Sequence, residues 1–310
     1  MDPVGNLIFM PSIICLLLGL HWAGSQYPWT DQRIVSVFIL SGGLMSAFLY
    51  LQQYLQEDAT VPPRIFKTRN VWAAAFFSFN LGAGFILTIY YLPVWFQAVK
   101  ETAAIQSGIM NLPLLIAVVF VSVAAGALVT LWGHYAPFMI LASILMPTGY
   151  GLLSTMTPST ETHVWILYQL IAGTGVGLGL QQPLMAVQAV LDLADVPTGT
   201  ALVIFLQTLG GSISVSIGQF VFSHKLTQSV HSIVPDLDPG LIFHTGATDL
   251  KNLVEGGEMV LLLRRAYNNA LMKTFLVSAV TAGATVVGSL FIEWRSVKGK
   301  KERKGDVEKG

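Results

Sequence analysis

The chain has 310 residues, of which 53% are hydrophobic and 11% are charged, and its formal net charge at pH 7 is zero. An ordinary soluble domain carries about 25% charged residues, so this composition excludes a typical soluble protein. The neutral charge balance gives no indication of nucleic-acid binding. The mean hydropathy of +0.63 indicates a membrane protein instead.

Eight apolar runs follow one another along the chain, and each approaches or exceeds the roughly 20 residues that cross a bilayer as a helix. Seven contain no formally charged residue, and the last contains only Lys273. The predicted fold class is therefore all-α, a polytopic membrane helix bundle forming one transmembrane domain over residues 1–292. The predicted spans are 4–22, 34–51, 71–97, 108–132, 137–156, 164–191, 199–222 and 270–292.

The distribution of Lys and Arg predicts that both ends of the chain are cytoplasmic. In that orientation the inner loops hold Arg64, Lys67 and Arg69, whereas the short outer loops hold only Arg33 and Lys100. The connection 223–269 is then extracellular. The tail 293–310 is rich in charge and poor in hydrophobic residues, so it is predicted to be a disordered, basic, cytoplasmic segment.

The sixth run carries four alternating glycines at 173, 175, 177 and 179. They form two interleaved small-xxx-small pairs, which let helix backbones approach closely in lipid. At 100° per residue, Gly173, Gly177, Gln181 and Gln188 fall within an arc of about 80°. We therefore expect a tightly packed helix that turns its amides toward an interior surface. A dinucleotide-binding loop is rejected, because that motif needs a preceding strand and a soluble βαβ unit.

Two prolines are predicted to shape helix ends beside the pathway. Pro93 lies among aromatic residues near the end of the third run and should kink or unwind that helix. Pro113 repeats the arrangement near the start of the fourth run. For both residues, anchoring and kinking remain the alternative to any direct contact with a ligand.

Polar, uncharged side chains within the spans are the candidates for a substrate pathway. Because the lining they offer is amide and aromatic, we expect bulky, amphipathic organic substrates. For each residue the alternative is an amide that bonds across a helix interface, worth about 1 kcal/mol. The candidates are Asn80, Gln97, Asn111, Gln169, Gln181, Gln188 and Gln207.

Acidic residues are absent from all eight predicted spans, although intramembrane acids are the usual carriers of protons in antiport. Asp192 and Asp195 lie in the turn between the sixth and seventh spans. Helix-end polarity or a gate contact explains them better than proton coupling does.

Other function classes lack their signatures. The six histidines are scattered, so no metal site is expected. No Walker motif is present, so ATP-driven transport is not expected. A charged ring or a carbonyl filter loop would indicate a channel, and neither is visible. We expect no enzyme activity and no cofactor.

Several short motifs, taken in order, resemble one transporter family. In this chain they are Asp2-Pro3-Val4-Gly5, Pro63 with Phe66-Lys67, Leu92-Pro93, Phe96-Gln97-Ala98-Val99, Ser107-Gly108, Leu112-Pro113, Pro137-Phe138, Gln188-Ala189-Val190 and Gly210-Gly211. The chain resembles the carboxy-terminal part of a fungal major facilitator superfamily transporter, of the fourteen-helix drug:proton antiporter type.

That resemblance implies efflux of a toxin, drug or secondary metabolite in exchange for protons, at the plasma membrane or alternatively the vacuolar membrane. It covers only the last eight of fourteen helices, and a major facilitator pathway lies between two helical halves. A truncated product, an internal start, or a subunit whose partner chain supplies the missing helices would each explain this. Two alternatives stay open: a non-transporting remnant or interaction subunit, and a siderophore transporter.

Overall fold

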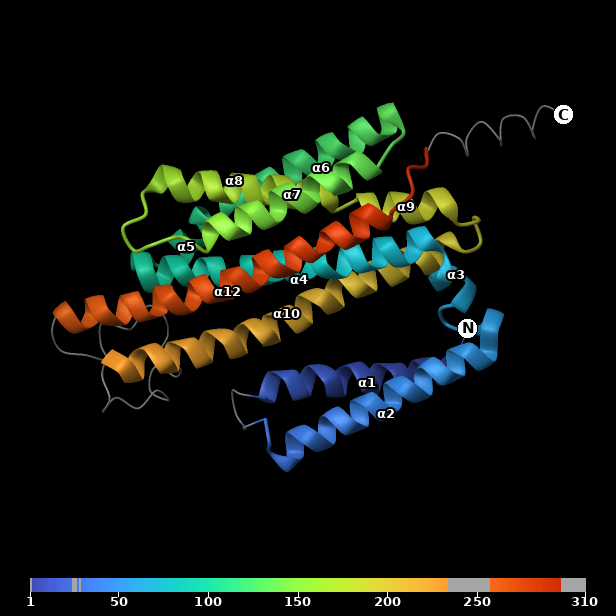
Figure 1. Ribbon diagram of the computed structural model, residues 1–310, viewed down its shortest axis with the longest axis horizontal. Coiled ribbons are helices and arrows are strands. Elements are labelled where there is room, and N and C mark those ends of the chain that lie inside the picture. The colour runs from blue at the N-terminus through green and yellow to red at the C-terminus, as the bar shows by residue number, and fades with distance from the viewer. Residues whose placement is uncertain (1, 24–26, 28, 234–256, 297–310) are drawn as a thin grey trace.

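The computed structural model describes residues 2–23, 27, 29–233 and 257–296 (Figure 1). Within these residues, eight helical segments are long and apolar enough to cross a membrane. The predicted all-α membrane bundle is therefore confirmed. The helices are α1 (Pro3–Trp22), α2 (Gln32–Leu55), η1 (Gln56–Asp58), α3 (Pro63–Lys67), α4 (Arg69–Lys100), α5 (Ala104–Met110), α6 (Leu112–Trp132), α7 (Ala136–Leu153), α8 (Thr162–Gly179), α9 (Gln182–Val190), α10 (Val196–Ile233) and α12 (Gly257–Phe291).

The helices form two groups. Helices α1 and α2 pair as a hairpin, and the helices from α4 to α12 form a bundle beside it (Figure 1). Helix α4 lies at the centre of this bundle and packs mainly against α12, α10 and α9. Small residues on α4, including Ala73, Ala74 and Gly82, are buried, and such residues allow the close helix contacts that stabilise membrane proteins.

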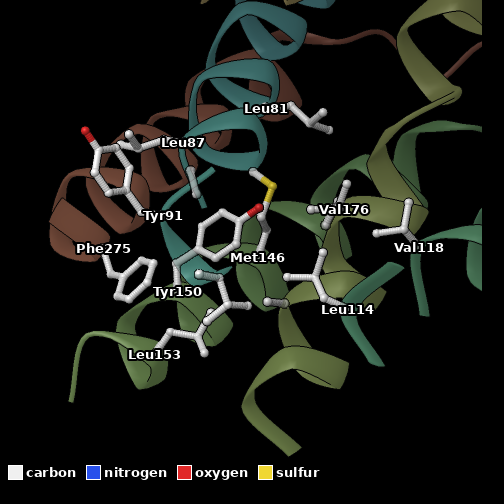
Figure 2. Close-up of a cluster of buried hydrophobic side chains, with 14 of the residues drawn as sticks. Leu81, Leu87, Tyr91, Leu114, Val118, Met146, Tyr150, Leu153, Val176 and Phe275 are labelled. Carbon is white, nitrogen blue, oxygen red and sulfur yellow. The ribbon is translucent and has the colours of Figure 1, made fainter. Parts of the chain in front are cut away.

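The core of the bundle joins α4, α7 and α12. Tyr91, Tyr150 and Phe275 come from these three helices and are at most 2% exposed, and Figure 2 shows them with Met146 and Leu153. Lipid tails are as apolar as these side chains, so packing contacts rather than exclusion from water hold the core together. The core fixes α4, whose polar residues are candidates for function.

Two predicted spans are interrupted in the structure. The fourth is divided into α5 and α6 at Asn111, and the sixth into α8 and α9 at 180–181. Proline occupies the first turn of α6 and of α9, at Pro113 and Pro183. A proline there cannot donate to the preceding turn, which accounts for both breaks. Pro93, by contrast, lies within α4, which continues to Lys100, so the helix is not unwound there.

The connection predicted over 223–269 is partly helical. Helix α10 continues to Ile233 and α12 begins at Gly257. Residues 223–233 contain neither Gly nor Pro, and Pro235 follows shortly after; a helix usually ends before such a proline. The rest of that connection, 234–256, and the tail beyond residue 296 lie outside the described residues.

Candidate substrate-pathway site

The alternating glycines of α8 face different neighbours. A Cβ on Gly177 would lie 2.8 Å from the Val118 carbonyl oxygen, and one on Gly173 would lie 2.8 Å from the Ala117 Cβ, both on α6. A Cβ on Gly175 would instead collide with the backbone of Met146 on α7. The two interleaved glycine pairs therefore let α8 pack closely between α6 and α7.

Gln169 bridges the break between α5 and α6. Its Nε2 donates to the Met110 carbonyl oxygen at 3.0 Å, and its Oε1 accepts from the Leu114 N–H at 3.4 Å. The side chain is fully buried. Because both amide ends satisfy backbone groups that a continuous helix would pair, the geometry gives Gln169 a structural role.

Gln97 and Asn111 lie near the same break. The Gln97 Nε2 donates to the Ser107 hydroxyl at 3.0 Å, which ties the end of α4 to α5. Asn111 separates α5 from α6, and its buried Oδ1 has no hydrogen-bond partner among the described residues. The structure thus brings Gln97, Asn111 and Gln169 into one region at the α5–α6 break.

Asn80 and Gln207 belong to a second region, where α4 crosses α10. A Cβ on Gly82 would collide with the Gln207 carbonyl oxygen, and a Cβ on Gly210 would collide with that of Phe79. One glycine on each helix therefore permits this crossing. Asn80 is buried, and its Nδ2 donates to the Phe76 carbonyl oxygen at 2.9 Å in its own helix.

Gln181 and Gln188 lie at and beyond the start of α9, and both are exposed. Gly173 and Gly177, in contrast, are buried against α6. The break at 180–181 separates the two pairs, so the continuous arc expected from the sequence does not extend through the span. Gln181 thus lies immediately before α9 and Gln188 within it, both exposed, and α9 packs against α4 and α10.

Gln182 is a further polar residue at the start of α9, and it is not among the predicted pathway residues. It is fully buried at the first position of α9, and neither side-chain amide atom has a hydrogen-bond partner among the described residues. An unpartnered buried polar group costs about 1–3 kcal/mol. In the sequence, Pro183 directly after Gln182 indicates that a new helix begins here, since proline favours the first turn of a helix.

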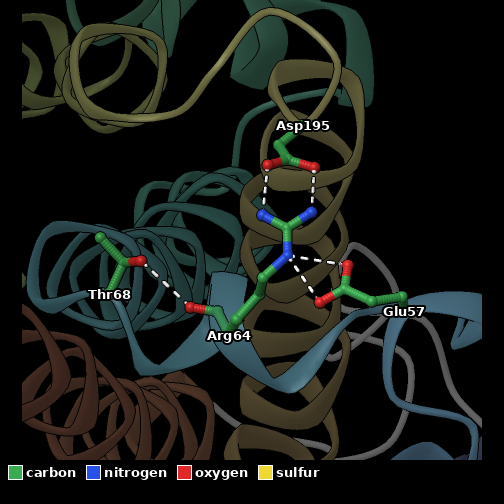
Figure 3. A network of polar contacts seen from close by, with 4 residues as sticks. All are labelled: Glu57, Arg64, Thr68 and Asp195. Atoms are coloured by element: carbon green, nitrogen blue, oxygen red, sulfur yellow. Dashed lines mark hydrogen bonds and ion pairs between the residues drawn. The ribbon is translucent and has the colours of Figure 1, made fainter.

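An ionic site joins residues that are far apart in the chain, so the sequence alone does not indicate it. The Arg64 guanidinium donates to both carboxylate oxygens of Asp195, at 2.5 and 2.9 Å, and its Nε donates to Glu57 at 2.8 Å (Figure 3). The hydrogen bonds from Arg64 hold the pKa of Asp195 below its ordinary value. This geometry fits the expected gate or helix-end contact for Asp195.

Metal-ligating side chains do not cluster in the described part of the chain, where no three of His, Cys, Asp and Glu come together as a potential site.

Known proteins similar to this chain are fungal efflux pumps. The MFS-type efflux pump MFS1 of Arthroderma benhamiae is 47% identical over 301 residues, which are 97% of this chain and 56% of that protein. The aspyridones efflux protein of Neocamarosporium betae is 48% identical over 301 residues, covering 97% of this chain and 53% of that protein. Efflux pump roqT of Penicillium rubens is 44% identical over 298 residues. No family model matches the chain.

Solved structures of transporters resemble the fold of this chain. A bacterial homologue of the human lysosomal transporter Spinster, inward-facing and occupied, superposes with a TM-score of 0.58 at 16% identity, covering 91% of this chain and 62% of that one. The chain is therefore similar in sequence to MFS-type efflux pumps over part of their length and has a partial major facilitator fold. It spans about half the length of the curated relatives that it matches.

Proposed function

We propose that this chain forms the carboxy-terminal part of a proton-coupled exporter of the major facilitator type, acting on a toxin, drug or secondary metabolite. The observation that carries the proposal is the similarity to efflux pumps over 95–97% of the chain. The exposed amides of α9, beside α4 and α10, supply neutral hydrogen-bonding groups for an amphipathic organic substrate. The proposed membrane is the plasma membrane.

The exporter needs a second wall, because a major facilitator pathway lies between two helical halves. We propose that this wall comes either from a longer form of the same polypeptide or from a partner chain. The proton-carrying acid belongs to that wall, since the eight predicted spans of this chain contain no Asp or Glu and Asp195, in the turn before α10, is already paired with Arg64.

Deletion and complementation test the proposal. Deleting the gene should lower efflux of the toxic compound and increase sensitivity to it, and the chromosomal gene should restore both. Expressing residues 1–310 alone then tests whether this chain suffices. Unchanged efflux after deletion would favour the non-transporting alternative, and a defect confined to iron-limited growth would favour siderophore transport.

The site assignment has its own test. Replacing Gln181 and Gln188 together with Ala should reduce export without lowering the protein's abundance in the membrane. The matched control replaces Gln53 and Gln228 with Ala, since these amides are also exposed but lie outside α9. Equal export by both double variants would reject Gln181 and Gln188 as pathway residues.

A further inference from the structure

The α1–α2 hairpin attaches to the bundle mainly along one helix, α10. Helix α1 packs against α2 and α10, and Figure 1 shows the hairpin beside α10. The Phe9 ring lies 5.2 Å from the Phe205 ring, and the Trp29 ring lies 5.5 Å from the Phe220 ring. These two aromatic contacts are 15 residues apart on α10, or roughly 22 Å at 1.5 Å per residue.

The ionic site adds a third contact, at the start of α10. Asp195 directly precedes α10, Glu57 lies in η1 at the end of α2, and Arg64 lies in α3 between the hairpin and α4. One guanidinium thus joins two carboxylates from segments that the chain separates by more than 130 residues (Figure 3). Without Arg64, Glu57 and Asp195 would present like charges to each other across this junction.

The three side chains of the ionic site differ in how far they are exposed to solvent. Asp195 is 15% exposed, whereas Arg64 is 52% and Glu57 is 66% exposed. Isolated surface ion pairs contribute little, but a guanidinium that grips a carboxylate with two parallel bonds is a geometrically specific contact. The pairing therefore acts on the position of the turn before α10 more than on global stability.

We propose that Arg64 is a positioning residue that fixes the start of α10 to the α1–α2 hairpin, so that the hairpin and α10 move as one unit. In this arrangement the α1–α2 hairpin restricts the movement of α10 relative to the rest of the bundle. Helix α10 carries Gln207 and packs against α4 and α9, so its position sets the geometry of the candidate pathway. That consequence for transport rests on the proposed function, whereas the mechanical coupling does not.

Crosslinking measures the coupling without any transport assay. Cys15 is the single cysteine of the chain, so Cys15→Ser combined with Phe9→Cys and Phe205→Cys places one thiol on α1 and one on α10. A short bis-methanethiosulfonate reagent then joins them, and a maleimide-polyethylene glycol gel shift counts the thiols that remain. We expect Arg64→Ala or Asp195→Ala to slow crosslinking at least five-fold, and Glu57→Ala to slow it less.

Charge exchange separates positioning from a general folding defect. The exchange Arg64→Asp with Asp195→Arg restores an ion pair of reversed polarity between α3 and the start of α10, and it is made together with Glu57→Gln, because Glu57 would otherwise face the new carboxylate at position 64. Its crosslinking rate should return to within two-fold of that of Glu57→Gln alone. Arg295→Ala is the control, because it removes an exposed ion pair, with Glu293 at 2.8 Å, that does not involve the hairpin. Parent-like crosslinking in Arg64→Ala, or no recovery in the exchanged pair, would overturn the proposal.

Export by the protein expressed from the chromosomal gene provides a second measurement. Arg64→Ala should lower the maximal export rate and leave the substrate concentration at half-maximal export unchanged, because the substituted residue positions a helix and does not contact substrate. If the protein exports nothing, the proposed function fails while the crosslinking result still decides the coupling.

Discussion

The backbone of Gly82 on α4 lies directly against the carbonyl oxygen of Gln207 on α10, with no room for a Cβ between them. Gly210 makes the reciprocal contact with Phe79. This paired close approach sets the distance between the two helices that carry Asn80 and Gln207. The polar candidates on α4 and α10 therefore depend on two glycines that have no polar chemistry of their own.

Replacing Gly82 with Ala should destabilise the protein, although Ala is the better helix former. The added methyl group would overlap the Gln207 carbonyl oxygen, and overpacking of this kind costs about 1–3 kcal/mol. The measurement is the unfolding midpoint of the purified protein in detergent. Gly126→Ala is the control, since a Cβ there meets nothing within 4 Å; equal midpoints for the two variants would contradict the close contact.

Replacing Gln169 with Met should also destabilise the protein, because Met keeps the volume and removes both amide hydrogen bonds. The Met110 carbonyl and the Leu114 N–H would then be unpaired in a buried position, at about 1–3 kcal/mol. Thermal unfolding gives the size of the loss. Hydrogen exchange should accelerate locally at residues 110–115, and protection equal to that of the parent would show that other groups satisfy the break.

Periodicity and span length were enough to predict the helical membrane bundle, because long uncharged runs have few other folds available. The breaks inside two spans are harder to predict. Pro113 indicates a helix end near the start of the fourth span, but Pro183 follows a run of glycines that itself favours one continuous, closely packed helix. The Arg64–Asp195 pair left no local signal, since its residues are 131 positions apart. Likewise, no pattern could reveal that Gln169 bonds to backbone while Gln181 is exposed, because burial depends on the tertiary fold.

A network of Asn70, Tyr135 and Glu293 closes the end of α12. The Tyr135 hydroxyl donates to the Glu293 carbonyl oxygen at 2.9 Å and accepts from the Asn70 Nδ2 at 3.1 Å, while the Glu293 N–H donates to the Asn70 Oδ1 at 2.9 Å. Tyr135→Phe keeps the shape but removes the hydroxyl that accepts from the buried Asn70 Nδ2, whereas the Glu293 carbonyl oxygen still accepts from the Arg295 N–H at 2.9 Å. The unpaired Asn70 donor should destabilise the protein by about 1–3 kcal/mol.

Alkaline pH provides a second measurement of the same network. Burial raises the pKa of Tyr135 to about 12 from an ordinary value of 10.0, so the folded protein keeps this proton after the unfolded chain has begun to lose it. The stabilising contribution is complete below pH 10 and is lost as pH rises toward 12. The unfolding midpoint of the parent should therefore fall more between pH 10 and pH 12 than that of Tyr135→Phe. An equal fall in both proteins would contradict the assignment.

Asp2 connects the start of α1 to the end of α2. Its carboxylate accepts from the Gly5 N–H at 2.7 Å, from the Gln52 Nε2 at 2.9 Å and from the Thr60 hydroxyl at 3.2 Å. The Gly5 hydrogen bond, supported by those of Gln52 and Thr60 against the opposing effect of burial, lowers the pKa of Asp2 from its ordinary value of 3.8. The carboxylate therefore stabilises the hairpin above pH 3.8, and this contribution is lost as pH falls through the lowered pKa.

Asp2→Ala should loosen the first turn of α1 at neutral pH, since removing a helix N-cap costs about 1 kcal/mol. Hydrogen exchange over residues 3–10 measures this opening. Asp2→Asn retains an oxygen that can cap Gly5 but loses the charge, so it should protect the turn better than Asp2→Ala and abolish the acid dependence seen in the parent. Identical exchange in the parent and Asp2→Ala at pH 7 would show that the α1–α2 hairpin does not depend on this carboxylate, and that its end is held by helix packing alone.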